Sequence, residues 1–202
     1  MAGQAFEPDL TLWDAWQPAE VARRLTGVDA TWYVTAGWAL DLHRGRQTRE
    51  HEDIEISVPE EQFPAVRQAL SELELWVVGG GLAHPVEPET LAAHYQTWAR
   101  DPATGAWRLD VMREAWEGQT WVFRRDPRVR RPRERVIAHT EDGIPYARPE
   151  IALLFKAKAS RPKDDADFES VLPLLDREQR EWLAGSIALV HPGHHWLRAL
   201  RG

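Results

Sequence analysis

The chain contains no cysteine among its 202 residues. This absence excludes a disulfide framework, a thiolate metal site and a thiol nucleophile. No apolar run approaches the roughly 18 residues that a membrane helix needs, and the first residues lack the basic and apolar stretches of a secretory signal. We therefore expect a cytoplasmic protein without a membrane partner.

Positive charge is also scarce in one half of the chain. The whole sequence carries 32 Asp and Glu against 25 Lys and Arg, which gives a net charge of −7. Residues 1–90 hold 16 acidic and 6 basic side chains, whereas residues 91–202 hold 16 and 19. A uniformly basic nucleic-acid-binding surface is therefore disfavoured, and the acidic half suits metal ions or a cationic substrate.

The order of predicted elements is mixed α/β first and helical last. With 43% hydrophobic residues the chain can form a folded core. Apolar periodicity predicts a helix over residues 12–25 with Leu12 in the core, and the C-terminal third reads as amphipathic helices. Residues 31–37 read as a strand that runs into a tight turn, and residues 38–45 as a short helix stopped by Gly45. Strands are also predicted at 53–58 and 120–125, a hairpin of two strands at 95–99 and 107–112, and a basic loop at 126–135. We predict an α/β (α+β) fold with a mixed β-sheet, divided into a domain of residues 1–145 and a small helical part of residues 146–202.

Two acidic segments suggest a metal site. In "DIEIS", Asp53 and Glu55 share one face of the predicted strand, and Ile54 and Ile56 share the other. If a neighbouring strand aligned its face with this one, Asp110 would add a third carboxylate. Such oxygen ligands suit Mg²⁺ or Mn²⁺ in two-metal phosphoryl chemistry. A merely solvated acidic strand face is the alternative.

The stretch "VTAGWALDLHRGRQTREHEDIEISV", residues 34–58, has a specific multi-part spacing. It contains a small-residue turn before Trp38, then Gly-Arg-x-Thr-Arg-x-His over residues 45–51, then acid-x-acid at residues 53–55. This pattern resembles the nucleotidyltransferase superfamily that includes DNA polymerase β. It is most similar to the aminoglycoside 2''-adenylyltransferase and lincosamide nucleotidyltransferase families, and residues 148–175 look like their C-terminal helices.

The resemblance implies that residues 1–145 form a nucleotidyltransferase catalytic domain. It implies transfer of a nucleoside monophosphate, AMP from ATP, to a hydroxyl of a small molecule such as an aminoglycoside- or lincosamide-like antibiotic, with release of pyrophosphate and a role in antibiotic resistance. Asp53, Glu55 and Asp110 would be the catalytic residues and the Mg²⁺ or Mn²⁺ ligands, with Asp110 as general base. The expected nucleotide contacts are Thr35, Ala36, Gly37, Arg46, Arg49, Lys156 and Lys163.

Two residues depart from the family pattern. Ala36 replaces the first glycine of the turn, and because alanine disfavours positive φ we expect an altered turn. Glu55 replaces the second aspartate and sets its carboxylate one methylene further out. These departures keep open a non-catalytic nucleotide-binding protein. A toxin-type enzyme acting on tRNA or protein is a further alternative, so nucleic acid is disfavoured as a partner without being excluded. The toxin-type alternative is favoured by one feature of the sequence, a basic run made of Arg124, Arg125, Arg128, Arg130 and Arg131.

Overall fold

The computed structural model describes residues 4–202, which divide into two compact units. Unit 1 contains the residues up to Val34 together with Glu50–Trp116, and unit 2 contains Thr35–Arg49 and Glu117–Gly202. Both units are discontinuous in sequence, so they differ from the division into residues 1–145 and 146–202. That division stays a prediction about functional domains.

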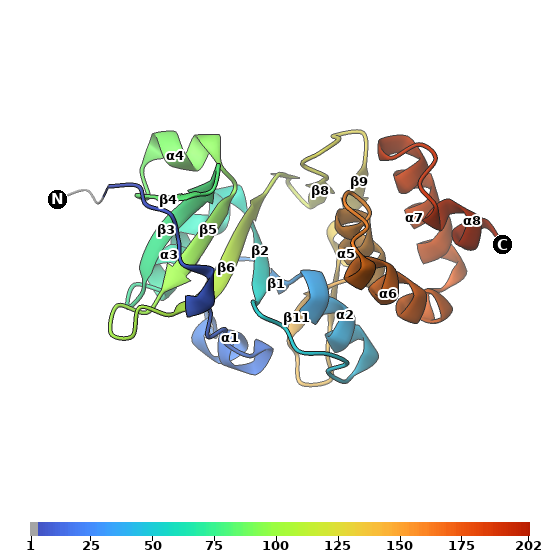
Figure 1. The fold of residues 1–202 in the computed structure, drawn as a ribbon. Helices are drawn as coiled ribbons and strands as arrows, with labels where there is room; N and C mark the ends of the chain where they lie inside the picture. The colour runs from blue at the N-terminus through green and yellow to red at the C-terminus, as the bar shows by residue number, and fades with distance from the viewer. Residues whose placement is uncertain (1–3) are drawn as a thin grey trace. The chain divides into compact units, whose positions relative to one another are not determined.

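Unit 1 is a mixed sheet with helices (Figure 1). The elements in chain order are a 3₁₀ turn (Leu10–Leu12), α1 (Pro18–Arg24), β1 (Tyr33–Val34), β2 (Glu55–Pro59), a 3₁₀ turn (Glu60–Gln62), α3 (Phe63–Ala69), β3 (Glu74–Gly79), β4 (Leu82–His84), α4 (Pro88–Ala93), β5 (Gln96–Arg100) and β6 (Trp107–Glu114). The strands have the order β1-β2-β6-β5-β3-β4, in which β2 and β6 are parallel and the other pairs are antiparallel. The predicted mixed-sheet fold is thereby confirmed, as is the predicted hairpin of β5 and β6.

One face of this sheet is held in the core by a row of side chains in register. Four adjacent strands contribute one fully buried residue each to this row, namely Ile56, Val111, Thr97 and Val77. Ile54 on the same face is also fully buried. The predicted apolar face of residues 53–58 is therefore confirmed, and its burial fixes which way the acidic residues between the isoleucines point.

The opposite face carries a second row in register, which we call the carboxylate–tryptophan row. It consists of Glu55, Asp110, Trp98 and Trp76, again one residue from each of β2, β6, β5 and β3. Register partners on adjacent strands point to the same side of a sheet. The two carboxylates therefore lie next to each other, with the two indoles following on the antiparallel side.

The predicted opening helix over residues 12–25 is wrong in its first half. Proline is favoured at the first position of a helix, and α1 accordingly begins at Pro18. The preceding segment is extended along β6, where Asp14 N–H donates to Trp107 O at 3.1 Å and Trp16 N–H donates to Arg108 O at 3.1 Å. Leu12 is 42% exposed and not in the core.

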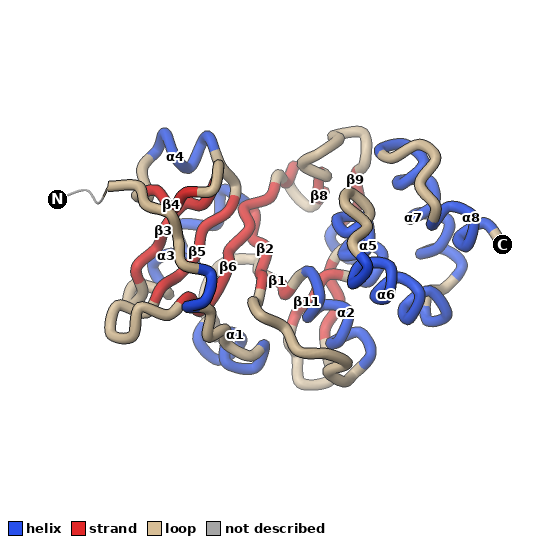
Figure 2. Tube along the Cα trace, viewed as in Figure 1, coloured by secondary structure: helices blue, strands red, loops and turns tan. Residues whose placement is uncertain are grey.

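Unit 2 combines short strands with the C-terminal helices, as the sequence predicted (Figure 2). The predicted loop at residues 126–135 is corrected in part, because it contains a strand and a 3₁₀ turn.

Among residues 4–202, no helix is long and apolar enough to cross a membrane. In chain order the elements are α2 (Ala36–Arg44), β8 (Thr120–Val122), β9 (Arg130–Pro132), a 3₁₀ turn (Arg133–Arg135), β10 (Ile137–His139), β11 (Pro145–Ala147), α5 (Pro149–Lys156), α6 (Pro162–Val171), a 3₁₀ turn (Leu172–Leu174), α7 (Arg177–Val190) and α8 (Trp196–Arg201), with β7 (Trp116–Glu117) at the chain's passage from unit 1.

Because Ile56 is fully buried behind the carboxylate–tryptophan row, we expect Ile56→Ala to lower the free energy of unfolding by about 2–5 kcal/mol. Leu12→Ala is the matched control and should change it by less than about 0.5 kcal/mol, since Leu12 is largely exposed. Urea denaturation followed by circular dichroism measures both. Equal losses in the two variants would contradict this core assignment.

Candidate active site

The candidate catalytic carboxylates lie in unit 1, on the parallel pair β2–β6. Glu55 and Asp110 are register partners, and Asp110 N–H donates to Ile54 O at 2.9 Å. Asp110 is 2% exposed, Glu55 is half-buried, and Asp53 is exposed just before β2 begins. The sequence predicted a shared carboxylate site only if the strand of Asp110 aligned its acidic face with that of Glu55, and the two strands are aligned in this way.

Asp110 is an unusual carboxylate because half of it lacks a partner. Gln96 Nε2 donates to Asp110 Oδ2 at 2.5 Å, while the buried Oδ1 has no partner of good hydrogen-bond geometry among residues 4–202. Burial raises the pKa of Asp110 well above its ordinary value, and the nearby charges of Glu55 and Asp53 raise it further. Hydrogen bonding from the side chain of Gln96, and then from that of Trp98, lowers this pKa in part. A cation placed here would offset both the burial and the repulsion.

The donor set fits a divalent cation that also binds a substrate phosphate. In the described part of the chain, no three carboxylate or imidazole side chains are gathered into a complete metal site. Mg²⁺ usually keeps several waters and uses only one or two carboxylates plus substrate phosphates. The unpartnered Asp110 Oδ1 and the adjacent Glu55 supply such a partial set.

The predicted phosphate-binding turn lies in unit 2, at the start of α2. Thr35 is the extended residue before the helix, and Ala36 adopts φ 53. Ala36 thus takes up the left-handed conformation that glycine occupies more easily, and the altered turn expected from this substitution stays a prediction. The helix ends at Gly45 with φ 69, as its sequence predicts.

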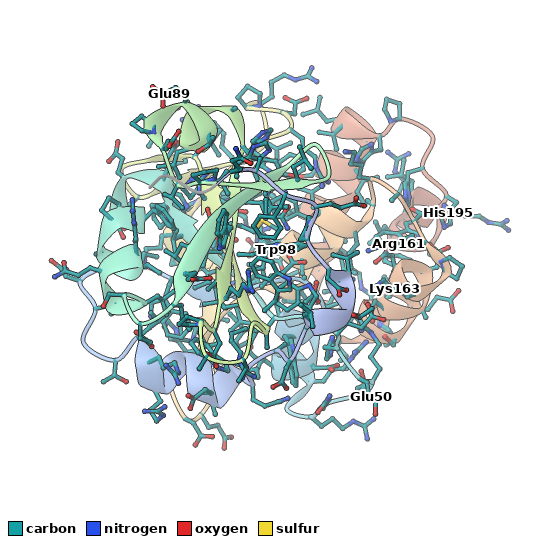
Figure 3. All side chains as sticks on the ribbon, turned by 60° about the vertical axis from the view of Figure 1, so that its left-hand side comes forward. Glu50, Glu89, Trp98, Arg161, Lys163 and His195 are labelled. Atoms are coloured by element: carbon teal, nitrogen blue, oxygen red, sulfur yellow. The ribbon has the colours of Figure 1, made fainter. Side chains whose placement is uncertain are left out.

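Two of the predicted phosphate contacts are exposed and two are already paired. Arg46 and Lys163 are exposed (Figure 3 labels Lys163 near the start of α6). Lys156 Nζ lies 3.0 Å from Asp164 Oδ1 and 2.9 Å from Asp167 Oδ2, and both aspartates are buried while Lys156 is half-buried. Arg49 Nη2 lies 3.4 Å from Asp167 Oδ2. Sequence reasoning missed these aspartates as partners, since both read as ordinary charges of a helix's first turns.

The arginines of the basic run have partners within the fold, although only Arg131 among them is buried. Arg131 is buried, and its guanidinium lies 3.1 Å from Glu150 and 3.4 Å from Glu178, over the ring of Trp182. Arg125 Nη1 donates to the Phe155 carbonyl at 2.9 Å. Arg128 pairs with Asp126, and Arg130 pairs with Glu117. These arginines are therefore engaged within the fold, which does not favour the RNA-binding alternative.

The mixed sheet and its paired carboxylates agree with the fold that the sequence resemblance implies. The family model described as aminoglycoside-2''-adenylyltransferase matches residues 19–97. This match confirms the predicted resemblance to that family and, with it, the predicted enzyme class, a nucleotidyltransferase. No curated protein matches the chain.

Two solved structures confirm the fold. The chain is 18% identical to the lincomycin-bound lincosamide antibiotic adenylyltransferase LnuA, with a TM-score of 0.53 and coverage of 76% of this chain and 94% of that chain. It is 14% identical to the antibiotic-resistance factor ANT(2'')-Ia in solution, with a TM-score of 0.50 and coverage of 95% and 88%. At sequence identities this low, the two comparisons show that the chains share a fold and show nothing further about activity.

Because Ala36 holds φ 53, we expect Ala36→Gly to raise the free energy of unfolding by about 1 kcal/mol. Ala39→Gly, a buried position inside the same helix, is the matched control and should lower it by at least about 0.5–1 kcal/mol. Thermal and urea unfolding of both variants measure the difference. A loss of stability in both would show that the turn does not strain Ala36.

The raised pKa of Asp110 makes stability depend on pH in a defined direction. Above the unfolded-state pKa of about 3.9 the unfolded chain loses this proton while the folded chain keeps it, so stability falls as pH rises toward the folded pKa. Asp110→Asn removes this loss. Without metal, we expect the stability of this variant relative to wild type to be greater at pH 7.5 than at pH 4.5.

Urea denaturation in chelator at the two pH values measures this gain, because the other titrating groups cancel between variant and wild type. Leu12→Ala, a non-titrating change at an exposed position, is the control and should show no pH-dependent difference from wild type. A gain from Asp110→Asn that is the same at both pH values would contradict the prediction.

Proposed function

We propose that the protein is a metal-dependent nucleotidyltransferase that moves AMP from ATP to a hydroxyl of an aminoglycoside- or lincosamide-like antibiotic and releases pyrophosphate. The observation that carries this proposal is the buried Asp110, with its unpartnered Oδ1, in register beside Glu55. The family match over residues 19–97 supports the same chemistry. Modification of an antibiotic in the cytoplasm would give the cell resistance.

In the proposed reaction, the acceptor hydroxyl oxygen forms a bond to the α-phosphorus of ATP. The bond from that phosphorus to the bridging oxygen breaks, and pyrophosphate leaves with its electron pair. The hydroxyl proton passes to the Asp110 carboxylate, whose raised pKa suits a general base. Mg²⁺ or Mn²⁺, when bound, supplies neutralisation of the phosphate charge.

The remaining site residues have proposed roles in holding the ion and the nucleotide. Asp53 and Glu55 hold the ion together with Asp110. The backbone N–H groups at the start of α2 contact the phosphates, and Gly37 allows their close approach. The proposed nucleotide contacts are Thr35, Ala36, Gly37, Arg46, Arg49, Lys163 and also Lys156, although its ammonium group already contacts Asp164 and Asp167.

The test is pyrophosphate release from ATP with Mg²⁺ or Mn²⁺ and a panel of aminoglycosides and lincosamides. We expect Asp110→Asn and Asp53→Asn each to lower kcat/KM by about 10²-fold or more, because the first removes the base and both remove ion ligands. Glu52→Gln removes a neighbouring exposed carboxylate outside this set and should leave kcat/KM within about twofold.

Calorimetric titration of ATP with either metal accompanies the assay. ATP binding without turnover of any acceptor would overturn the transferase proposal in favour of a nucleotide-binding protein. Modification of tRNA or protein, with binding that weakens steeply with salt, would overturn the proposed acceptor class.

A further inference from the structure

Strand β5 supplies the side-chain hydrogen bonds that reach the Asp110 carboxyl. Gln96 and Trp98 are two residues apart on β5, so both side chains lie on the face of the sheet that carries Asp110. Trp98 is the register partner of Asp110, whereas the register partner of Gln96 is Met112. Gln96 therefore lies diagonally across the strand pair from Asp110.

The diagonal position explains why a glutamine makes this contact. Diagonal neighbours on an antiparallel pair are about 7–8 Å apart, a separation that only long side chains bridge. Gln96 Nε2 nevertheless lies 2.5 Å from Asp110 Oδ2. An ionised carboxylate only accepts hydrogen bonds, so the amide presents its NH₂ group to it. Asparagine has the same amide on a side chain one methylene shorter and would not reach.

The bond from Gln96 makes the two carboxylate oxygens of Asp110 inequivalent. The last side-chain torsion of an aspartate is broad, so the side chain alone does not fix the plane of its carboxylate. Gln96 holds Oδ2, and Oδ1 is left without a partner of good hydrogen-bond geometry among residues 4–202. Oδ1 is therefore the oxygen available to a cation or to a hydroxyl proton.

Trp98 (labelled in Figure 3) is a second, weaker donor to the same carboxyl. Its hydrogen bond lowers the pKa of Asp110 less than the bond from Gln96 does. Its ring is packed edge-on against Trp13, with ring centroids 5.1 Å apart, and against Trp107 at 5.3 Å. The indole is thus held in place, and Gln96 is the stronger of the two donors.

We propose that Gln96 is a positioning residue for nucleotidyl transfer, whose amide holds Asp110 Oδ2 and leaves Oδ1 for the ion and the acceptor hydroxyl. This inference rests on the proposed function. A hydrogen bond to an ionised group is roughly twice as strong as a neutral one, and it stabilises the carboxylate form that accepts a proton or holds a cation. Glu55 repels that form from β2, and Gln96 offsets this repulsion from β5.

The experiment compares Gln96→Met, Gln96→Asn and the matched control Gln179→Met. Methionine keeps the length of glutamine and removes the amide, whereas asparagine keeps the amide and removes the reach. Gln179 in unit 2 also donates from Nε2 to a buried carboxylate oxygen, Glu150 Oε2, at 2.7 Å. Its replacement removes a comparable hydrogen bond that does not involve Asp110, and so measures the effect of a general loss of stability.

Steady-state kinetics separates positioning from binding. We expect both Gln96 variants to lower kcat about tenfold or more, because a charge-assisted hydrogen bond at the base is lost. The KM of the acceptor should stay within about twofold of wild type, since uniform binding is retained. Gln179→Met should leave kcat within about twofold, because it shares no partner with Asp110.

Calorimetric titration gives a readout without turnover. The probe is Mn²⁺ with α,β-methylene ATP, an analogue that cannot release pyrophosphate. We expect this pair to bind about threefold or more weakly to both Gln96 variants and unchanged to Gln179→Met. In the Asp110→Asn background, adding Gln96→Met should change the Kd by less than about twofold, because the amide acts through the carboxylate that is already lost.

Wild-type kcat in either Gln96 variant, or equal losses in the Gln96 and Gln179 variants, would overturn the positioning role. A raised acceptor KM with unchanged kcat would assign Gln96 to acceptor binding and overturn it as well. Failure of the proposed function looks different, because the wild type itself would then release no pyrophosphate with any acceptor. The Mn²⁺ titration still decides in that case whether Gln96 acts through Asp110, and absence of binding to the wild type would overturn both.

Discussion

The parallel pairing of β2 with β6 is the interaction on which the candidate site depends. It brings Glu55 beside Asp110, two residues that are 55 positions apart in sequence. The free energy for this arrangement comes from the other face of the sheet, where Ile56 and Val111 are fully buried as a register pair. Hydrophobic burial behind the strands thus holds two mutually repelling carboxylates in front of them.

Two features of the protein oppose folding and are maintained by the structure around them. Asp110 is buried with an unpartnered oxygen, and Ala36 holds a left-handed backbone conformation at the head of α2. Both coincide with positions expected to bind the ion or the nucleotide. Such costs persist where the surrounding packing enforces them, and they cluster at functional sites.

Positive charges that look equivalent in the sequence have separate uses in the fold. Lys156 is held by two buried aspartates, and Arg131 lies between two glutamates over an indole ring. Lys163 and Arg46 stay exposed. An arginine or lysine becomes buried only when its charge is paired. Counting cations along the chain therefore overstated the number available to a nucleotide or to RNA.

Local patterns in the sequence determined the alternation of residues 53–58, the end of α2 at Gly45, the start of α5 at Pro149 and the resemblance carried by residues 34–58. These features depend on neighbours a few residues away, so periodicity and turn chemistry reveal them. The tertiary structure alone decided the register that unites Glu55 with Asp110 and Trp98, the aspartate partners of Lys156, and the extended course before Pro18. Those features depend on contacts between residues distant in sequence, whose free energy no local pattern contains.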